Sequence, residues 1–162
     1  NIHAGFDETS EIFSKKYPGC ELSILDFYDP ERHTEVSIRR ARKAYPPFAG
    51  TQKININEWS PQGFWADFIF LSFAAHEIRD PAERILFFKK LRGFLSEEGR
   101  IAVMEHQRDQ YNFIAYNFGF FHFFSGKSWK KTFAGAGLFA ISEFKVNPFI
   151  KTFILKSHGA AH

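Results

Sequence analysis

Residues 66–106 read ADFIFLSFAAHEIRDPAERILFFKKLRGFLSEEGRIAVMEH, and this stretch decides the fold of the chain. It opens with residues 66–72, a nearly unbroken apolar run of strand length, which is typical of a parallel strand covered on both faces. A second short apolar run follows at residues 101–104. With a helix between them, the two strands predict a βαβ unit, which is almost always right-handed. Helices should therefore flank the sheet.

The helix of this unit has clear start signals. Asp80 offers an N-cap oxygen, Pro81 stands where no N–H donor is needed, and Glu83 completes a capping box. We expect the helix to end near Glu98, with Gly99 as the left-handed residue after it.

The carboxyl ends of the two strands are the predicted site. In a unit of this kind, ligands bind outside the carboxyl ends of the strands. The segments that leave those ends contain two histidines and two glutamates, namely His76, Glu77, Glu105 and His106.

Composition indicates one globular domain. The chain has 162 residues, of which 44% are hydrophobic and 24% charged, which is enough for one core and short for two. We expect a single domain over residues 1–157 and a disordered tail over residues 158–162. No apolar run reaches the length of a membrane span. The single cysteine, Cys20, and the lack of a secretory signal favour a reducing, cytoplasmic setting.

Charge and aromatic content indicate which binding partners to expect. The net charge is +3, and the basic residues are spread out apart from four in a predicted helix at residues 34–44. A solvated face is the simpler interpretation of those four, so a nucleic-acid partner is not expected. Many of the 22 phenylalanines fall in residues 111–124. A core, an apolar ligand or the interface of a homo-oligomer would each cover them, and all three stay open.

The start of the chain has the spacing of a nucleotide-binding unit. Residues 1–9 leave no room for a full strand before Gly5, so we expect an incomplete first strand and a missing N-terminal portion. Asp26 lies 21 positions after Gly5, close to the interval of about 20 residues between a glycine turn and a carboxylate that binds ribose hydroxyls. The spacing alone leaves Asp26 open between a binding and a structural role.

Local patterns predict the remaining elements. They comprise helices at residues 11–17, 34–44 and 129–136, the last capped by Ser128 and closed by Gly137, strands at residues 22–25 and 52–57, and a hairpin of residues 139–146 and 149–157.

The order of these elements and two local motifs resemble class I S-adenosylmethionine-dependent methyltransferases, in the group that includes the ubiquinone and menaquinone methyltransferases. The motifs are ADFIFLSFAAHEIRD and FFKKLRGFLSEEGRIAVMEH. The resemblance implies an α/β fold with a Rossmann-like, mostly parallel sheet flanked by helices, ending in an antiparallel hairpin. In the first motif of the family, which is rich in glycine, this chain has HAGFD, so only Gly5 remains while His3 and Asp7 replace glycines.

The resemblance also implies S-adenosylmethionine as cofactor and a set of residues around it. Asp26 would bind the ribose hydroxyls. The other expected cofactor contacts are Gly5 at the turn, Phe27 beside the adenine, Asn57, Glu58 and Trp59 at the adenine edge, and Ser72 and Phe73 along the methionine part.

Methyl transfer needs few catalytic residues, because it is an in-line attack that needs a base only if the nucleophile must lose a proton. His76 and His106 are the candidate bases, and Tyr116 or His122 would orient a substrate. A structural, hydrogen-bonded histidine is the alternative for each. No metal ligand set of standard spacing is present, so no metal site is expected.

The leading hypothesis is therefore methyl transfer to a small, apolar or aromatic acceptor. A non-catalytic binding or interaction module with the same fold is the alternative, because of the altered glycine turn. The hypothesis of another nucleotide-binding enzyme, such as a dehydrogenase, ranks last because it does not explain the terminal hairpin. Fold alone does not decide between them.

Overall fold

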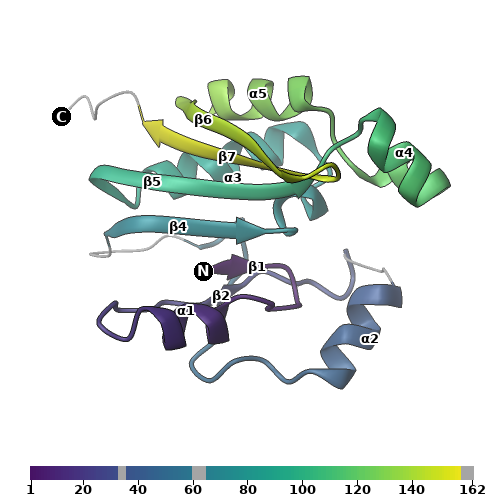
Figure 1. The fold of residues 1–162 in the computed structure, drawn as a ribbon. Coiled ribbons are helices and arrows are strands. Elements are labelled where there is room, and N and C mark those ends of the chain that lie inside the picture. The colour runs from purple at the N-terminus through teal and green to yellow at the C-terminus, as the bar shows by residue number, and fades with distance from the viewer. Residues whose placement is uncertain (33–35, 60–64, 158–162) are drawn as a thin grey trace. The chain divides into compact units, whose positions relative to one another are not determined.

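The computed structural model describes residues 1–32, 36–59 and 65–157 (Figure 1). The chain divides into two compact units, Asn1–Trp59 and Ser60–His162, and each is described by itself. The predicted tail at residues 158–162 and the first two residues of the predicted helix at 34–44 lie outside the described residues.

The first unit is a small parallel α/β structure. Its strands pair in the order β3-β2-β1, all parallel. In chain order its elements are β1 (Ile2–His3), α1 (Ser10–Lys16), β2 (Leu25–Asp26), α2 (Val36–Ala44) and β3 (Gln52–Lys53).

The strands of this unit are shorter than the sequence patterns predicted. The strand expected at residues 22–25 lies at Leu25–Asp26, and the one expected at residues 52–57 ends at Lys53. The alternation after Lys53 belongs instead to a turn, in which the amide of Trp59 donates to the carbonyl of Asn55 at 2.7 Å. Polar and apolar residues also alternate by chance in turns, so the pattern predicted a longer strand than the structure has.

The second unit contains the βαβ segment and the terminal hairpin. Its strands pair in the order β4-β5-β7-β6, with β4 and β5 parallel and β7 antiparallel to both of its neighbours. The elements are β4 (Ala66–Ser72), the 3₁₀ turn η1 (Ala75–Glu77), α3 (Pro81–Arg92), β5 (Leu95–His106), α4 (Gln110–Tyr116), the 3₁₀ turn η2 (Asn117–His122), α5 (Gly126–Gly135), β6 (Leu138–Asn147) and β7 (Ile150–Ser157).

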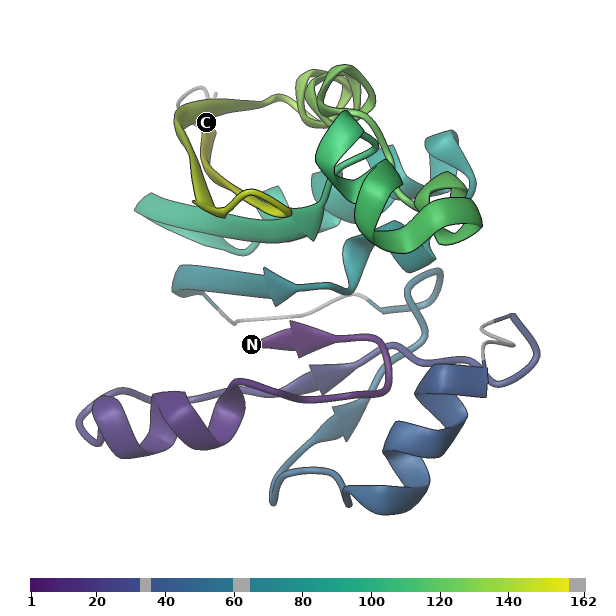
Figure 2. The same ribbon diagram turned by 45° about the vertical axis from the view of Figure 1, so that its right-hand side comes forward.

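This arrangement confirms the predicted fold class: parallel strands with helices between them, followed by an antiparallel pair. Asp80 caps α3 as predicted, since its side chain accepts the amide of Glu83 at 2.8 Å. In Figure 2, α4 and η2 lie beyond the carboxyl end of β5.

The core of the second unit is built from aromatic rings of α3 and α5. Phe88 of α3 packs edge-on against Phe133 of α5, with 5.2 Å between ring centroids. Phe133 stacks on Trp129 at 5.8 Å and meets Phe153 of β7 at 5.3 Å. All four rings are at most 2% exposed, so part of the phenylalanine content fills the core.

The predicted end of α3 was wrong. The helix ends at Arg92, not near Glu98, and Gly99 lies inside β5, which already begins at Leu95. Phe94 and Leu95 are buried, which draws the chain into the sheet one helical turn before the glycine. Gly99 is needed for a different reason: a Cβ there would lie 2.8 Å from the carbonyl oxygen of Ala66.

The start of α5 was also misplaced. The helix begins at Gly126, and its N-cap is Ser125, whose hydroxyl accepts the amide of Ser128 at 3.2 Å. Gly137 follows the helix with φ +72°, as predicted.

The aromatic segment at residues 111–124, which the sequence left without secondary structure, forms α4 and η2. Asp109 caps α4 by accepting the amide of Asn112 at 3.1 Å. Phe113, Ile114 and Phe121 on this segment are exposed. Within the described residues, no helix combines the length and apolar character that crossing a membrane requires.

Candidate functional site

Parallel pairing of β4 with β5 brings the two predicted strand ends together in the second unit. Ser72 pairs with Met104, and the amide of Phe73 donates to the carbonyl of Met104 at 2.9 Å. The chain then turns into η1, which carries His76 and Glu77, while β5 continues to Glu105. The histidine and the two carboxylates are thus neighbours in space.

A buried pair, His76 and Glu105, forms the centre of this site. His76 Nδ1 lies 2.7 Å from Glu105 Oε2, and the amide of His76 donates to Glu105 Oε1 at 3.2 Å. Glu105 is fully buried and the His76 side chain is 11% exposed. One carboxylate therefore fixes both the ring and the backbone of His76.

The other ring nitrogen of His76 faces a second carboxylate. His76 Nε2 lies 3.2 Å from Glu77 Oε1, and His122 Nε2 lies 3.6 Å from the same oxygen. The Arg79 guanidinium ties the two histidine segments together, because it donates to the carbonyl oxygens of His122 at 2.5 Å and of His76 at 3.3 Å. We call His76, Glu77 and His122 the His–Glu–His cluster.

Electrostatics in the cluster favour the charged forms. Burial by itself would lower the pKa of His76, yet the charge of Glu105, the hydrogen bond to it and the hydrogen bond to Glu77 raise this pKa to about 10. Burial would raise the pKa of Glu77, but hydrogen bonds from His122 and His76 hold that pKa well below its usual range.

His106 lies outside this cluster, among aromatic rings. It stacks between Phe73 and Phe123, with centroid distances of 5.0 Å and 4.9 Å. Its Nδ1 lies 3.2 Å from Asn112 Oδ1, and its Nε2 lies 3.4 Å from the hydroxyl of Tyr116. The structure thus brings Tyr116 to His106 and His122 to His76.

Phe73 and Ser72 have unusual environments after β4. Phe73 has φ +48°, a left-handed conformation that is strained for a residue with a Cβ. The Ser72 hydroxyl oxygen is buried without a hydrogen-bond partner among the described residues. A buried hydroxyl of this kind is suited to a ligand's polar group.

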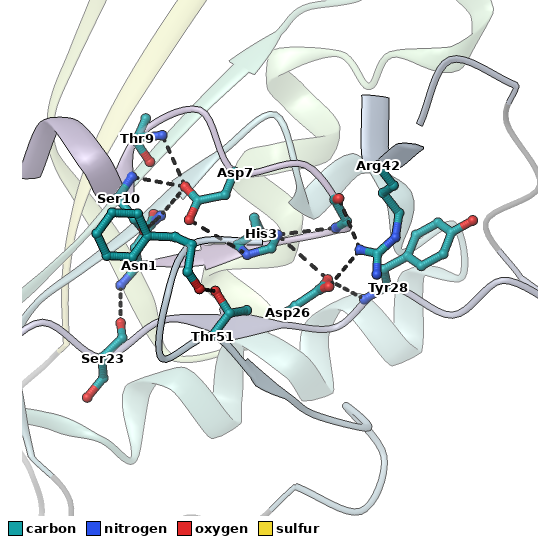
Figure 3. A network of polar contacts seen from close by, with 12 residues as sticks. Asn1, His3, Asp7, Thr9, Ser10, Ser23, Asp26, Tyr28, Arg42 and Thr51 are labelled. Carbon is teal, nitrogen blue, oxygen red and sulfur yellow. Dashed lines mark hydrogen bonds and ion pairs between the residues drawn. The ribbon is translucent and has the colours of Figure 1, made fainter. Parts of the chain in front are cut away.

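The first unit contains a separate network around Asp26 (Figure 3). Asp26 is 2% exposed; its Oδ2 accepts from Arg42 Nη1 at 2.7 Å and its Oδ1 accepts the amide of Tyr28 at 2.9 Å. His3 Nδ1 lies 3.6 Å from Oδ1. Arg42 also donates to the carbonyl of Gly5 at 3.0 Å and lies over the Tyr28 ring. The prediction that Arg42 belongs to a solvated face was therefore wrong.

Gly5 is required at the turn that follows β1. It has φ +97°, and a Cβ there would lie 2.7 Å from Cδ2 of Tyr28. Asp7 shapes the rest of this turn, because its Oδ1 accepts the amides of Thr9 and Ser10 at 3.1 and 2.9 Å. The glycine turn of the resemblance is thus replaced by one that side chains hold in place.

Burial lowers the pKa of His3 beside this turn, although Asp26 and then Asp7 act in the opposite direction. For the Asp7 carboxylate, hydrogen bonding outweighs the effect of burial on the pKa. Burial would raise its pKa, but hydrogen bonds from Ser10 and Thr9 lower it.

The remaining predicted cofactor residues of this unit differ in exposure. Phe27 is buried, whereas Asn57 and Glu58 are exposed in the turn after β3 and Trp59 is half-buried.

Sequence reasoning placed Glu105 at the predicted site without giving it a specific role, and it assigned no role to Arg79. The position of Glu105 at the end of a buried strand was a sequence signal for such a role. For Arg79, the carbonyl oxygens that it binds depend on the tertiary fold and leave no sequence signal.

No protein-family model matches the sequence, and no curated protein matches it. Solved structures do share its fold. The LepI complex with SAM has a TM-score of 0.65 at 15% identity, over 96% of this chain and 42% of that one. Mitomycin 7-O-methyltransferase MmcR has a TM-score of 0.64 at 12% identity, over 96% and 48%. An O-methyltransferase family 2 protein from Planctomyces limnophilus, in complex with apigenin, has a TM-score of 0.65 at 16% identity, over 96% and 49%.

The chain thus spans less than half the length of these three proteins. At such identities the similarity establishes the fold alone, which this chain shares with methyltransferases.

Proposed function

We propose that this chain is the catalytic part of an S-adenosylmethionine-dependent methyltransferase that methylates a hydroxyl oxygen of a small aromatic acceptor. The observation that carries the proposal is the buried pair in which Glu105 Oε2 lies 2.7 Å from His76 Nδ1. The fold shared with O-methyltransferase structures supports it.

His76 is the proposed general base. A hydroxyl nucleophile must lose its proton as it attacks a methyl group, so a proton acceptor is needed beside it. Glu105 holds Nδ1, so Nε2, which lies 3.2 Å from Glu77 Oε1, accepts that proton when the ring is neutral. The charge of Glu105 stabilises the imidazolium that results. Because the pKa of His76 is raised to about 10, the neutral base gains population as pH rises, and the rate should rise with it.

Residues of the first unit suit the nucleoside part of the cofactor. S-adenosylmethionine supplies a sulfonium methyl group when bound. A carboxylate has about four lone-pair sites, so Asp26 retains acceptor capacity for ribose hydroxyls beside Arg42 and the Tyr28 amide. In the second unit, the buried hydroxyl of Ser72, which has no hydrogen-bond partner among the described residues, offers a polar contact to a ligand.

The experiment that tests the base uses three variants, of which one is a control. Methyl transfer from S-adenosylmethionine to a panel of phenols and quinols is followed by mass spectrometry. His76→Gln and Glu105→Gln are expected to lower kcat by about 10²–10⁴-fold, the usual contribution of a general base. The matched control is His106→Gln, because His106 lies among rings and should leave most of kcat intact. A larger loss in His106→Gln than in His76→Gln would refute the assignment.

Cofactor binding is tested separately by calorimetric titration with S-adenosylmethionine and S-adenosylhomocysteine. Asp26→Ala should weaken binding by at least about tenfold, since it removes charge-assisted hydrogen bonds to ribose. The alternative is a non-catalytic module, which the replacement of two glycines by His3 and Asp7 favours. Absence of binding to either ligand would select that alternative.

A further inference from the structure

We propose that the His–Glu–His cluster is a binding site for one divalent transition-metal ion of the zinc type. The three residues each offer one ligand atom, and these atoms all lie within 4.8 Å of one another. The proposal goes beyond methyl transfer and does not depend on S-adenosylmethionine being bound.

Two of the three separations between the ligand atoms match a tetrahedral ion, and the third lies within 4.8 Å. Bonds of about 2.0–2.2 Å to zinc place neighbouring ligand atoms about 3.3–3.5 Å apart. His76 Nε2 and His122 Nε2 lie 3.2 Å and 3.6 Å from Glu77 Oε1. Two imidazoles and one carboxylate form a known zinc ligand set that leaves a fourth position open.

The surroundings of the cluster orient its ligand atoms. Zinc-bound histidines usually donate their other N–H to a carboxylate, and Glu105 Oε2 lies 2.7 Å from His76 Nδ1. This contact leaves Nε2 of His76 as the metal-facing atom. Arg79 holds the backbone carbonyls of both His76 and His122, which limits how far the two segments can move apart.

The side chains of the cluster differ in exposure. Those of His76 and Glu77 are 11% and 5% exposed, whereas that of His122 is 27% exposed, although its Nε2 atom is buried. The cluster is therefore largely shielded from solvent, and His122 is its most exposed member. His76 and Glu77 are adjacent in η1, but His122 comes from η2, 45 positions later, so the three ligands form no standard metal motif in the sequence.

An ion in this position would compete with the proposed base. It takes the lone pair of His76 Nε2 that proton abstraction requires. Zinc is therefore expected to inhibit methyl transfer, a consequence that rests on the proposed function, whereas the site itself does not.

The test is titration of the full chain with Co²⁺ and Zn²⁺ without S-adenosylmethionine. It uses a Cys20→Ser background, because the exposed Cys20 thiol is a competing ligand. The visible absorption of Co²⁺ reports low coordination number, and calorimetry gives the stoichiometry and affinity of Zn²⁺. We expect one ion per chain.

Four variants locate that ion. His122→Ala and Glu77→Gln each remove a ligand and should weaken Zn²⁺ binding by at least tenfold. Glu105→Gln should weaken it by about 10–100-fold, because Glu105 orients the His76 ring. His106→Ala, a histidine outside the cluster, should leave it unchanged. His122→Ala removes a partly exposed side chain, and circular dichroism checks that the variant is folded.

Two results would overturn the proposal: no tight ion in the background protein, or an ion whose affinity stays unchanged in both His122→Ala and Glu77→Gln. Metal binding without methyl transfer would contradict only the proposed function, and methyl transfer without metal binding would contradict only this inference.

Discussion

At the scale of single residues, the buried pair of Glu105 and His76 is expected to stabilise the second unit. Removing one partner of a buried ion pair leaves an uncompensated charge, which costs about 3–5 kcal/mol. Glu105→Ala should lower the free energy of unfolding by that amount, measured by urea denaturation. A double-mutant cycle with His76→Ala should give a coupling of about 1–3 kcal/mol.

The matched control for Glu105 is Glu143→Ala. Glu143 pairs with Lys130 and Lys151 at 2.8 and 2.7 Å, but its side chain is 27% exposed. Exposed pairs contribute about 0–1 kcal/mol. Equal losses in the two alanine variants would contradict the view that burial makes the Glu105 pair important.

We predict a second effect, in which His3 makes the folded chain less stable at mildly acidic pH. Because its folded pKa lies below 6.5, the unfolded chain takes up a proton on His3 before the folded chain does. The free energy of unfolding should therefore fall as pH drops from 6.5 toward 5, before most carboxylates titrate. Urea unfolding at several pH values measures this. The His3→Asn variant should lose less over the same range, and an equal loss would rule His3 out as the cause.

The site residues differ in how well the sequence predicted that they would come together. His76 and Glu105 follow apolar runs, so strand ends could be identified and their meeting inferred. His122 was a candidate, but 45 positions separate it from Glu77, and nothing in an aromatic run predicts that η2 returns it to η1. Arg42 is one of four basic residues within residues 39–43, and the pattern does not say which of them reaches Asp26.

At the scale of elements, β5 shows how a glycine can be misread. Gly99 has the position of a helix C-cap in the sequence, yet it serves the start of a strand where backbone atoms approach closely. A Cβ on it would lie 2.8 Å from the Ala66 oxygen and 2.9 Å from the Ser96 oxygen. Sequence patterns predicted the start of α3 correctly, because Asp80 and Pro81 act locally. They did not predict its end, because that end depends on the burial of Phe94 and Leu95.

This close approach predicts that Gly99→Ala destabilises the second unit by about 1–3 kcal/mol, since backbone atoms must shift to admit the methyl group. Thermal or urea unfolding measures the change. Gly19→Ala is the matched control, because nothing lies within 4 Å of a Cβ there, and it should stay within about 0.5 kcal/mol. Similar losses in both variants would show that crowding is not the reason.

At the scale of the whole chain, each unit contains its own part of the proposed chemistry. The first unit contains the Asp26 network and the turn at Gly5, which suit a nucleoside. The second contains His76, Glu105 and the His–Glu–His cluster, which suit proton transfer and metal binding. Composition and element order predicted the fold class, because apolar runs and caps are local signals. The networks depend on side chains that only the folded chain brings together.

The double pairing of β5 has a consequence for hydrogen exchange. Residues 101–104 pair with β4 on one side and β7 on the other, and Ile101 and Val103 have no exposed surface. Local opening of the hairpin or of β4 alone leaves part of this ladder intact. The amide protons of residues 101–104 should therefore exchange with deuterium only when the whole second unit unfolds. Their exchange rates would report its global stability directly, in the absence of any denaturant.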